Sequence, residues 1–269
     1  MTDTPDVALR PLAVVTGASS GIGFELARQF AQNGFDVLVN SEDPGLEEAA
    51  RELGATGAGV MLCQADLSTY EGVERLYAQI VGTGRPVEAL ALNAGIGAGG
   101  AFVDIDLDKH FELIDLNVRG TVHLAKRVLT DMVARNGGKV LFTSSIASTM
   151  PGSFQATYNA SKSFIQSLAE ALQNELKDTE VTVTSLMPGP TETNFFHRAD
   201  MDDTMVGTSK KDDPAQVAEQ GFKALMAGKN RAVGGGVKTK VQELGAKVMP
   251  DALKAQMHRG MAEPGTGKD

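Results

Sequence analysis

Two side chains in one short segment have the types and spacing needed for proton transfer. Tyr158 and Lys162 stand four residues apart, and in a helix that interval places both side chains on one face. A phenol with its ordinary pKa of about 10 is a poor acid or base near neutral pH. Because a neighbouring positive charge stabilises the phenolate, we expect Lys162 to lower the pKa of Tyr158. Taken alone, the pair also fits a helix start with an incidental i, i+4 contact.

A hydroxyl group stands close to this pair. The run KVLFTSS, which ends at Ser145, is mostly apolar and predicts a buried strand that delivers its last residues to one edge of a sheet. Thirteen residues separate Ser145 from Tyr158. The loop between them can fold the Ser145 hydroxyl back beside the phenol.

A glycine-rich turn near the N-terminus predicts a nucleotide site. Gly17, Gly21 and Gly23 follow the short apolar strand Leu12–Val15 and precede an amphipathic helix expected over Phe24–Asn33. Glycine is needed where backbone approaches a phosphate, and a helix N-terminus favours an anion. The spacing G-x-x-x-G-x-G differs from the commoner dinucleotide pattern. The strand, turn and helix together nevertheless indicate dinucleotide binding.

These features together resemble the short-chain dehydrogenase/reductase family over roughly the first 200 residues. The matching segments, in the family's order, are TGASSGIG, Asp66 in CQADL, NAG at 93–95, Asn117 in LNVRG, Ser145, YNASK and PGPTET. The resemblance implies a doubly wound, Rossmann-type parallel sheet of about seven strands. It also implies an NAD(P)-dependent oxidoreductase that interconverts a secondary alcohol and a ketone by hydride transfer.

The resemblance assigns four catalytic residues. Tyr158 would exchange the proton with the substrate oxygen, and Ser145 would hold that oxygen. Lys162 would bind the nicotinamide ribose besides acting on the tyrosine. Asn117 would hold a water that links Lys162 to solvent. The alternative for Asn117, which lies in an apolar helix expected from 108 to 136, is a core amide bonded to neighbouring backbone.

The resemblance also implies which residues bind the cofactor. Asp66 would reach the adenine amino group and Leu67 would back the ring, although Asp66 could instead cap a helix. The 93–95 turn would border the ribose, and Thr191 and Thr193 would orient the nicotinamide. The full predicted set is Gly17, Ser19, Ser20, Gly21, Ile22, Gly23, Glu42, Asp66, Leu67, Asn93, Ala94, Gly95, Tyr158, Lys162, Pro188, Gly189, Thr191 and Thr193.

The residues after the second strand, expected at Asp36–Val39, bear on the choice between NAD and NADP. In the family an acid near the end of this strand favours NAD, and a base there accepts the phosphate of NADP. Residues 40–43 contain no base, and Ser20 is also uncharged. Glu42 and Asp43 would repel a phosphate, although both could simply be favourable charges at a helix N-terminus. The sequence therefore favours NAD and leaves NADP open.

Composition excludes several other function classes. A net charge of −9 argues against nucleic-acid or anionic-membrane partners. No apolar run approaches the roughly 20 residues of a membrane span. The first residues lack the pattern of a signal peptide, and the single Cys63 suits a reducing cytoplasm. No metal is expected, because the four histidines have no ligand spacing.

We expect residues 1–269 to form a single dinucleotide-binding oxidoreductase domain with a substrate lid at about 194–212. A helical tail is expected at about 236–262, in two stretches separated by Pro250. This tail departs from the pattern through which many family members form tetramers. The helix that contains Tyr158 and the long helix before it still offer the family's dimer face. A homodimer is therefore expected.

The substrate is expected to be largely apolar. Residues 145–157 and 187–196 contain no lysine or arginine that could pair with an acidic substrate. The side chains expected to enclose the substrate, some of which would only fill core, are Met150, Phe154, Met187, Phe195, Phe196, Met201 and Met205. An alternative function is a dinucleotide-sensing binding protein without turnover, but such proteins usually lose the tyrosine or lysine that this chain keeps.

Overall fold

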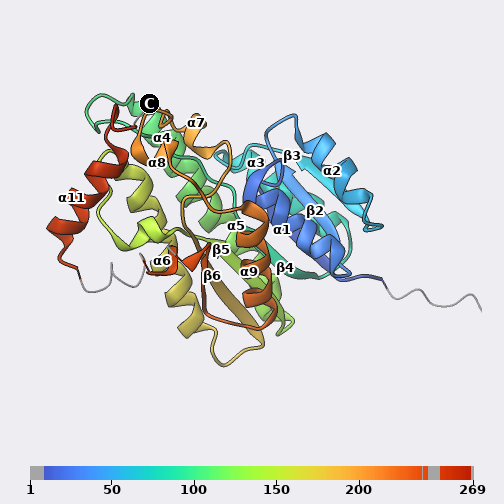
Figure 1. Ribbon diagram of the computed structural model, residues 1–269. Coiled ribbons are helices and arrows are strands. Elements are labelled where there is room, and N and C mark those ends of the chain that lie inside the picture. The colour runs from blue at the N-terminus through green and yellow to red at the C-terminus, as the bar shows by residue number, and fades with distance from the viewer. Residues whose placement is uncertain (1–8, 238, 242–248, 268–269) are drawn as a thin grey trace, which may run out of the picture.

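Parallel strands form a central sheet (Figure 1). The computed structural model describes residues 9–237, 239–241 and 249–267. Within these residues the strands are β1 (Leu12–Thr16), β2 (Asp36–Ser41), β3 (Val60–Gln64), β4 (Val87–Leu92), β5 (Gly138–Thr143), β6 (Val181–Pro188) and β7 (Arg231–Gly234). They pair in the order β3-β2-β1-β4-β5-β6-β7, and every neighbouring pair is parallel. The doubly wound sheet predicted from the sequence is confirmed.

Helices cover both faces of this sheet. On one face pack α3 (Tyr70–Gly82), α5 (Thr121–Ala134) and α6 (Ala156–Glu175). On the other face pack α1 (Gly21–Gln32), α2 (Leu46–Gly54) and α9 (Pro214–Met226). Strands covered on both sides read as continuous apolar runs, and β1 is indeed buried at every position. None of the helices in the described part of the chain is long and apolar enough to cross a membrane.

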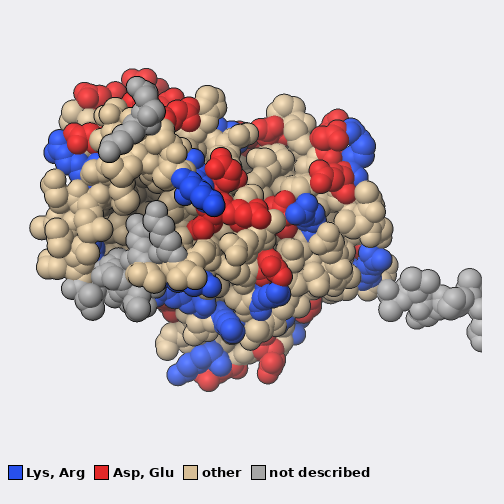
Figure 2. Space-filling view, viewed as in Figure 1, with Lys and Arg blue, Asp and Glu red and all other residues tan. Residues whose placement is uncertain are grey.

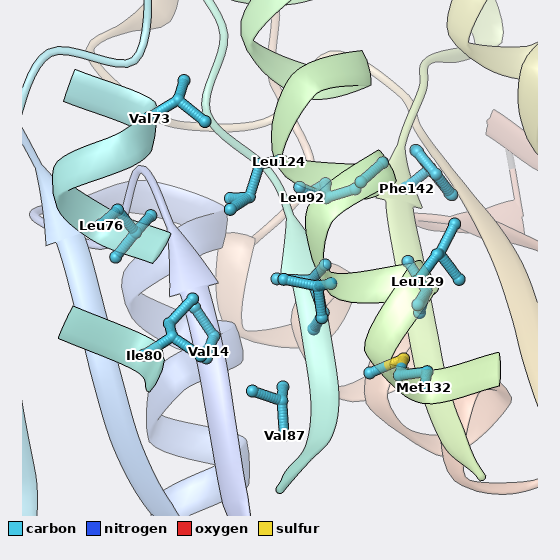
Figure 3. Close-up of a cluster of buried hydrophobic side chains, with 14 of the residues drawn as sticks. Val14, Val73, Leu76, Ile80, Val87, Leu92, Leu124, Leu129, Met132 and Phe142 are labelled. Carbon is cyan, nitrogen blue, oxygen red and sulfur yellow. The ribbon is translucent and has the colours of Figure 1, made fainter. Parts of the chain in front are cut away.

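Figure 3 shows the apolar core on the α3 and α5 side of the sheet. Leu76 and Ile80 of α3 face Val14 of β1, and Leu124 of α5 lies close to Leu92 of β4. Each of these side chains is almost fully removed from water. Burial of a side chain of this size contributes about 1.5–3 kcal/mol, so this core fixes the strands whose ends carry the site.

The long helix expected from 108 to 136 is interrupted. It consists of α4 (Leu107–Ile114), the π-helical turn η1 (Asp115–Gly120) and α5. A π turn often marks a functional site. Only glycine fits at position 120, because a Cβ atom there would lie 2.1 Å from the Leu67 carbonyl oxygen. Asn117 lies within the π turn, a local geometry that the helical spacing of the sequence did not predict.

The predicted lid and tail come together at one end of the molecule. The lid contains the short helices α7 (Phe195–Arg198) and α8 (Met205–Thr208), and the tail contains α11 (Asp251–Ala262). Figure 1 places α11 near α8, at the opposite end from α2. We call their shared apolar contact the lid–tail cluster, and it consists of Phe154, Phe195, Phe196, Ala199, Met201, Val206 and Ala262.

The helix expected after Pro250 is confirmed by α11. The first helical stretch expected in the tail falls largely on residues 238 and 242–248, which lie outside the described residues.

Candidate active site

A cleft lies at the carboxyl ends of the strands, where the strand order changes direction between β1 and β4. Open parallel sheets bind their ligands at such a switch point. The cleft has a volume of about 280 Å³, and every residue predicted to bind the cofactor lines it. Figure 2 shows acidic side chains gathered in the middle of the face seen in Figure 1, with a few basic ones beside them.

The glycine-rich turn forms one wall of the cleft. Gly17 has a φ of +66° and Gly21 a φ of +58°, a backbone conformation that other residues rarely adopt. A Cβ atom on Gly17 would lie 2.9 Å from the Ala94 Cα, and one on Gly23 would lie 2.0 Å from the Gly17 oxygen. A Cβ on Gly21 would lie 2.8 Å from the Thr193 Cγ2. The three glycines therefore allow β1, α1 and β4 to meet without a side chain between them.

Helix α1 begins inside this turn. It starts at Gly21, three residues before the expected start at Phe24, and Ser20 is its N-cap residue. The Ser20 side chain makes no capping hydrogen bond. The first backbone N–H groups of a helix have no partner within the helix and favour an anion. This helix start fits the diphosphate of a dinucleotide, so the residues present fit the implied cofactor.

A buried hydrogen-bond network joins the turn to the β4 end. The Asn93 and Ala94 backbone N–H groups both donate to the Thr16 Oγ1, at 2.9 and 3.0 Å. The Asn93 amide donates to the Thr16 carbonyl at 3.2 Å and accepts from the Thr143 hydroxyl at 3.2 Å. Asn93 thus ties together the ends of β1, β4 and β5. Thr16 and Thr143 belong to no motif that the sequence reveals.

Ser145 and Tyr158 lie together, as predicted. Ser145 ends the stretch after β5 and is the N-cap of the 3₁₀ turn η2 (Ile146–Thr149), where its Oγ accepts a hydrogen bond from the Ala147 N–H at 3.1 Å. The same hydroxyl donates to the Pro188 carbonyl at 3.5 Å and lies beside the Tyr158 phenol. Burial raises the pKa of Tyr158 to about 12, while the neighbouring Ser145 hydroxyl opposes that change.

Lys162 occupies the expected place one turn after Tyr158, but its predicted effect on the tyrosine is not found. Its Nζ donates to the Thr143 carbonyl at 3.0 Å and lies 5.9 Å from the centre of the Tyr158 ring. Burial lowers the pKa of Lys162 to about 8. The expected lowering of the Tyr158 pKa by Lys162 is therefore wrong for this structure, because burial of the phenol raises the pKa and Lys162 is not among the groups that lower it.

Asn117 lies behind the cleft rather than in its lining. Its Oδ1 accepts from the Ile96 N–H at 2.9 Å, and its Nδ2 donates to the Ile96 carbonyl at 2.9 Å and to the Ser161 Oγ at 3.1 Å. The alternative of a core amide bonded to backbone therefore describes this side chain. The water relay to Lys162 stays a prediction.

Two residues at the end of β2 have different roles, one structural and one at the cleft. Asn40 is buried, and its Nδ2 donates to the Cys63 and Ala65 carbonyls at 2.9 and 3.0 Å, so it joins β2 to β3. Glu42 lines the cleft, and burial, followed by the nearby charge of Asp66, raises the pKa of its carboxyl group. Of the two acids Glu42 and Asp43, Glu42 is the one that lines the cleft.

A base from a distant part of the sequence reaches the same rim. Arg198 of α7 lines the cleft and donates to the Asp43 carboxylate at 2.8 Å. The sequence does not indicate this contact, because the two residues are 155 positions apart and share no motif.

Asp66 is not a helix cap. Thr69 caps α3, since its side chain accepts from the Gly72 N–H. The Asp66 carboxylate instead accepts from the N–H and the hydroxyl of Ser68, both at 2.8 Å. Asp66 and Leu67 both line the cleft, so their predicted roles toward adenine stay open to test.

The family model for short chain dehydrogenase matches residues 11–204. The chain belongs to this family. Oxidoreductase UcpA from Salmonella typhimurium is 30% identical over 216 residues, which cover 79% of each chain. Dehydrogenase/reductase SDR family member 4 from Bos taurus is 33% identical over 186 residues, which cover 68% of this chain and 67% of the bovine protein.

Solved structures give the same result. The short-chain dehydrogenase from Sphingobium yanoikuyae in complex with NADPH matches with a TM-score of 0.78 and 26% identity, covering 83% of this chain and 87% of that chain. A short chain dehydrogenase/reductase from Burkholderia phymatum in complex with NAD has the same fold, with a TM-score of 0.81 and 23% identity over 92% and 95% of the two chains. Both structures thus share the fold of this short-chain dehydrogenase, one in complex with NADPH and the other with NAD.

The substrate end of the short-chain dehydrogenase cleft is only partly as predicted. Met150, Phe195 and Phe196 line it, and the Phe195 ring centre lies 5.1 Å from that of Tyr158. Four of the predicted enclosing residues do not line the cleft. Phe154 and Met201 fill the lid–tail cluster, Met187 is buried in β6, and Met205 is 46% exposed.

Other residues that the sequence analysis missed complete this end. Gln155 precedes α6, and His258 and Met261 reach the cleft from α11. Their lining positions depend on how the tail folds back onto the segment before Tyr158. No motif in the sequence signals that contact.

Proposed function

We propose that this short-chain dehydrogenase interconverts a secondary alcohol and a ketone, with NAD or NADP as hydride carrier. The observation that carries this proposal is the placement of the Ser145 hydroxyl and the Tyr158 phenol beside the buried Lys162, in the same cleft at the carboxyl ends of the strands. A hydroxyl and a phenol that lie side by side can both contact a single carbonyl oxygen of a substrate.

When bound, the dinucleotide supplies or accepts the hydride. In reduction, Ser145 holds the substrate oxygen and Tyr158 donates its proton to that oxygen. A phenol with a pKa of about 12 is protonated at neutral pH, so Tyr158 carries the proton that reduction needs, but so high a pKa makes it a weak acid in the free protein. Lys162, held by the Thr143 carbonyl, keeps a positive charge beside the site, which stabilises the negative charge that develops when Tyr158 gives up its proton. Oxidation of the alcohol would use the same groups in reverse.

Of the two cofactors we propose NAD. Glu42 lines the cleft at the end of β2, and Asp43 binds the Arg198 guanidinium. An acid at the rim favours ribose hydroxyls over a phosphate, and Arg198 already has a carboxylate partner.

We further propose a cytoplasmic homodimer with a largely apolar substrate and a lid at about 194–212. Exposed apolar side chains on and around α4, α5 and α6 support the dimer, namely Phe102, Val103, Leu107, Phe111, Ile114, Val122 and Phe164. Such a patch marks an interaction surface. Light scattering after size-exclusion chromatography tests the dimer, and a monomer at micromolar concentration contradicts it.

The experiment that tests the activity is a panel of aryl, long-chain and small charged ketones with each reduced cofactor. Oxidation of NADH or NADPH is followed by absorbance. We expect turnover of apolar ketones, with NADH preferred. Cofactor binding without turnover of any ketone would favour the alternative, a dinucleotide-sensing binding protein.

A further inference from the structure

An amide at the substrate end of the cleft has an unpaired donor. Gln155 is 6% exposed and lines the cleft. Its Nε2 is fully removed from solvent and has no hydrogen-bond partner among the described residues. Gln155 is the N-cap residue of α6, but its side chain does not cap the helix. A buried donor without a partner costs about 1–3 kcal/mol, so such a group in a binding cleft calls for a ligand.

A second polar group comes from the tail. His258 of α11 is 5% exposed and lines the same cleft. Its Nδ1 lies 2.8 Å from the Ser153 carbonyl oxygen. A carbonyl can only accept, so Nδ1 carries the proton and Nε2 keeps a free lone pair. Nε2 has no hydrogen-bond partner in the described part of the chain. Burial lowers the pKa of His258, which keeps the imidazole neutral at neutral pH.

One short segment, residues 153–155, connects these two groups. The Ser153 carbonyl holds the imidazole and its hydroxyl donates to the Ala255 carbonyl at 3.1 Å, while Gln155 extends into the cleft. The Phe154 between them belongs to the lid–tail cluster. Apolar side chains, including Phe195 and Met261, line the same cleft. A neutral, mostly apolar ligand fits here better than an ion.

We propose that Gln155 and His258 form a recognition subsite for a hydroxyl group of the substrate, remote from the carbon that accepts hydride. A hydroxyl can accept a hydrogen bond from the Gln155 Nε2 and donate one to the His258 Nε2, so its donor and acceptor match the two groups. The substrate class is then an apolar ketone, or the matching alcohol, that carries a second, hydroxyl oxygen. This inference rests on the proposed function and gives its substrate a polar feature that the sequence did not indicate.

Three kinds of matched ketone, one of them used as two isomers, test the subsite. Hydroxybenzylacetone, in its meta and para isomers, carries the hydroxyl. Benzylacetone lacks it, and methoxybenzylacetone keeps the oxygen but has no proton to donate. A site built to bind a hydroxyl discriminates strongly against the analogue without it. We expect wild-type kcat/KM for one hydroxybenzylacetone isomer to exceed that for benzylacetone and methoxybenzylacetone by tenfold or more.

Two variants separate recognition from structure. Gln155→Leu and His258→Phe should each reduce that preference about tenfold, the loss expected for one hydrogen bond. Gln155→Leu should also leave the melting temperature unchanged or raise it, because an apolar group replaces an unpaired buried donor. The control is Met257→Ala on the same helix, where the side chain is 45% exposed and outside the cleft. It should preserve the preference.

Equal efficiency for all three ketones in the wild type, or equal effects of Gln155→Leu on all three, would overturn the subsite. A clear fall in melting temperature for Gln155→Leu would also count against it, since the amide would then be paired in the free protein. Saturation-transfer NMR with the cofactor-loaded protein separates the two proposals. Selective binding of hydroxybenzylacetone without turnover would refute the oxidoreductase activity and keep the subsite, and absence of selectivity in both assays refutes the subsite.

Discussion

The two halves of the cleft are built in different ways. In the dinucleotide half, backbone atoms set the geometry, with Gly17 and Gly23 packed so closely that a Cβ atom on either would collide with its neighbours. In the substrate half, side chains from the lid and from α11 form the wall, and they come from parts of the chain that are far apart in sequence. Backbone constraints need particular residue types at fixed spacing, whereas side-chain walls accept many combinations.

The catalytic side chains lie where the halves meet, so changing them should affect chemistry without affecting either wall. The largest effect is expected for Tyr158→Phe, which removes one oxygen from the proton donor. General acid–base groups contribute about 10²–10⁴-fold to rate, and we expect kcat to fall within that range. Cofactor affinity, measured by fluorescence of bound NADH, should change little. A variant that retains more than about a tenth of the wild-type rate would remove Tyr158 from the mechanism.

Replacing Lys162 tests whether its buried charge lowers the free energy of unfolding of the protein. Burial lowers its pKa from 10.5 to about 8, which corresponds to a cost of about 3 kcal/mol for the charged form at neutral pH. Lys162→Met removes this cost and also the hydrogen bond to Thr143, worth about 1 kcal/mol. We expect the variant to lose activity and yet gain about 2 kcal/mol in free energy of unfolding at pH 7.

The pKa of Lys162 also predicts how the stability difference between wild type and Lys162→Met changes with pH. Below pH 8 both folded and unfolded chains hold the Lys162 proton, so the cost is constant. Between pH 8 and 10.5 the unfolded chain still holds the proton that the folded chain has released, so wild-type stability rises with pH. The difference between wild type and variant should therefore shrink from pH 8 towards pH 10. Urea denaturation of both proteins at pH 7, 8, 9 and 10 measures it, and a constant difference would refute the buried charge.

Gly23 tests the claim that backbone packing builds the dinucleotide half. In Gly23→Ala the new Cβ would lie 2.0 Å from the Gly17 oxygen and 2.5 Å from the Asn93 Nδ2, so the turn must shift. Overpacking of this kind costs about 1–3 kcal/mol, and we expect NADH affinity to fall as well. Gly54→Ala at the end of α2 is the matched control, because no atom lies within 4 Å of the added Cβ. It should stabilise the protein by up to about 1 kcal/mol. Equal effects of the two changes would contradict the packing argument.

The same difference explains what could be predicted from the sequence. The strands, the glycine-rich turn and the lining positions of the dinucleotide half follow from local patterns, because each depends on one strand and the turn after it. The substrate half depends on Gln155 and His258, and the rim between the two halves on Arg198; the positions of these residues depend on how the 194–212 segment and α11 pack. The direction of the Tyr158 pKa was predicted wrongly for a related reason. Spacing places Lys162 on the same helix face, but it does not give the depth of burial that decides the pKa.

The smallest expected effect concerns cofactor choice, at the rim where the two halves are joined by the Arg198–Asp43 ion pair. The wild type should prefer NAD. Ser41 bonds the Ser19 hydroxyl at 3.1 Å and lines the cleft, so Ser41→Arg places a guanidinium beside the ribose. We expect a shift of about tenfold in relative kcat/KM towards NADP, since one charge-assisted hydrogen bond is worth roughly 1.5–3 kcal/mol before losses.

Asp43→Asn provides the matched test of the distant base. It removes a negative charge from the rim and releases Arg198 from its 2.8 Å contact, so relative use of NADP should rise by severalfold, less than with Ser41→Arg. Adding Arg198→Gln to Asp43→Asn should cancel the gain if the freed guanidinium is its cause. Steady-state kinetics with both cofactors measures all four proteins. A wild-type preference for NADP of tenfold or more would contradict our choice of NAD. It would also make Arg198 the first residue to test as phosphate partner, because it lines the cleft within reach of that rim.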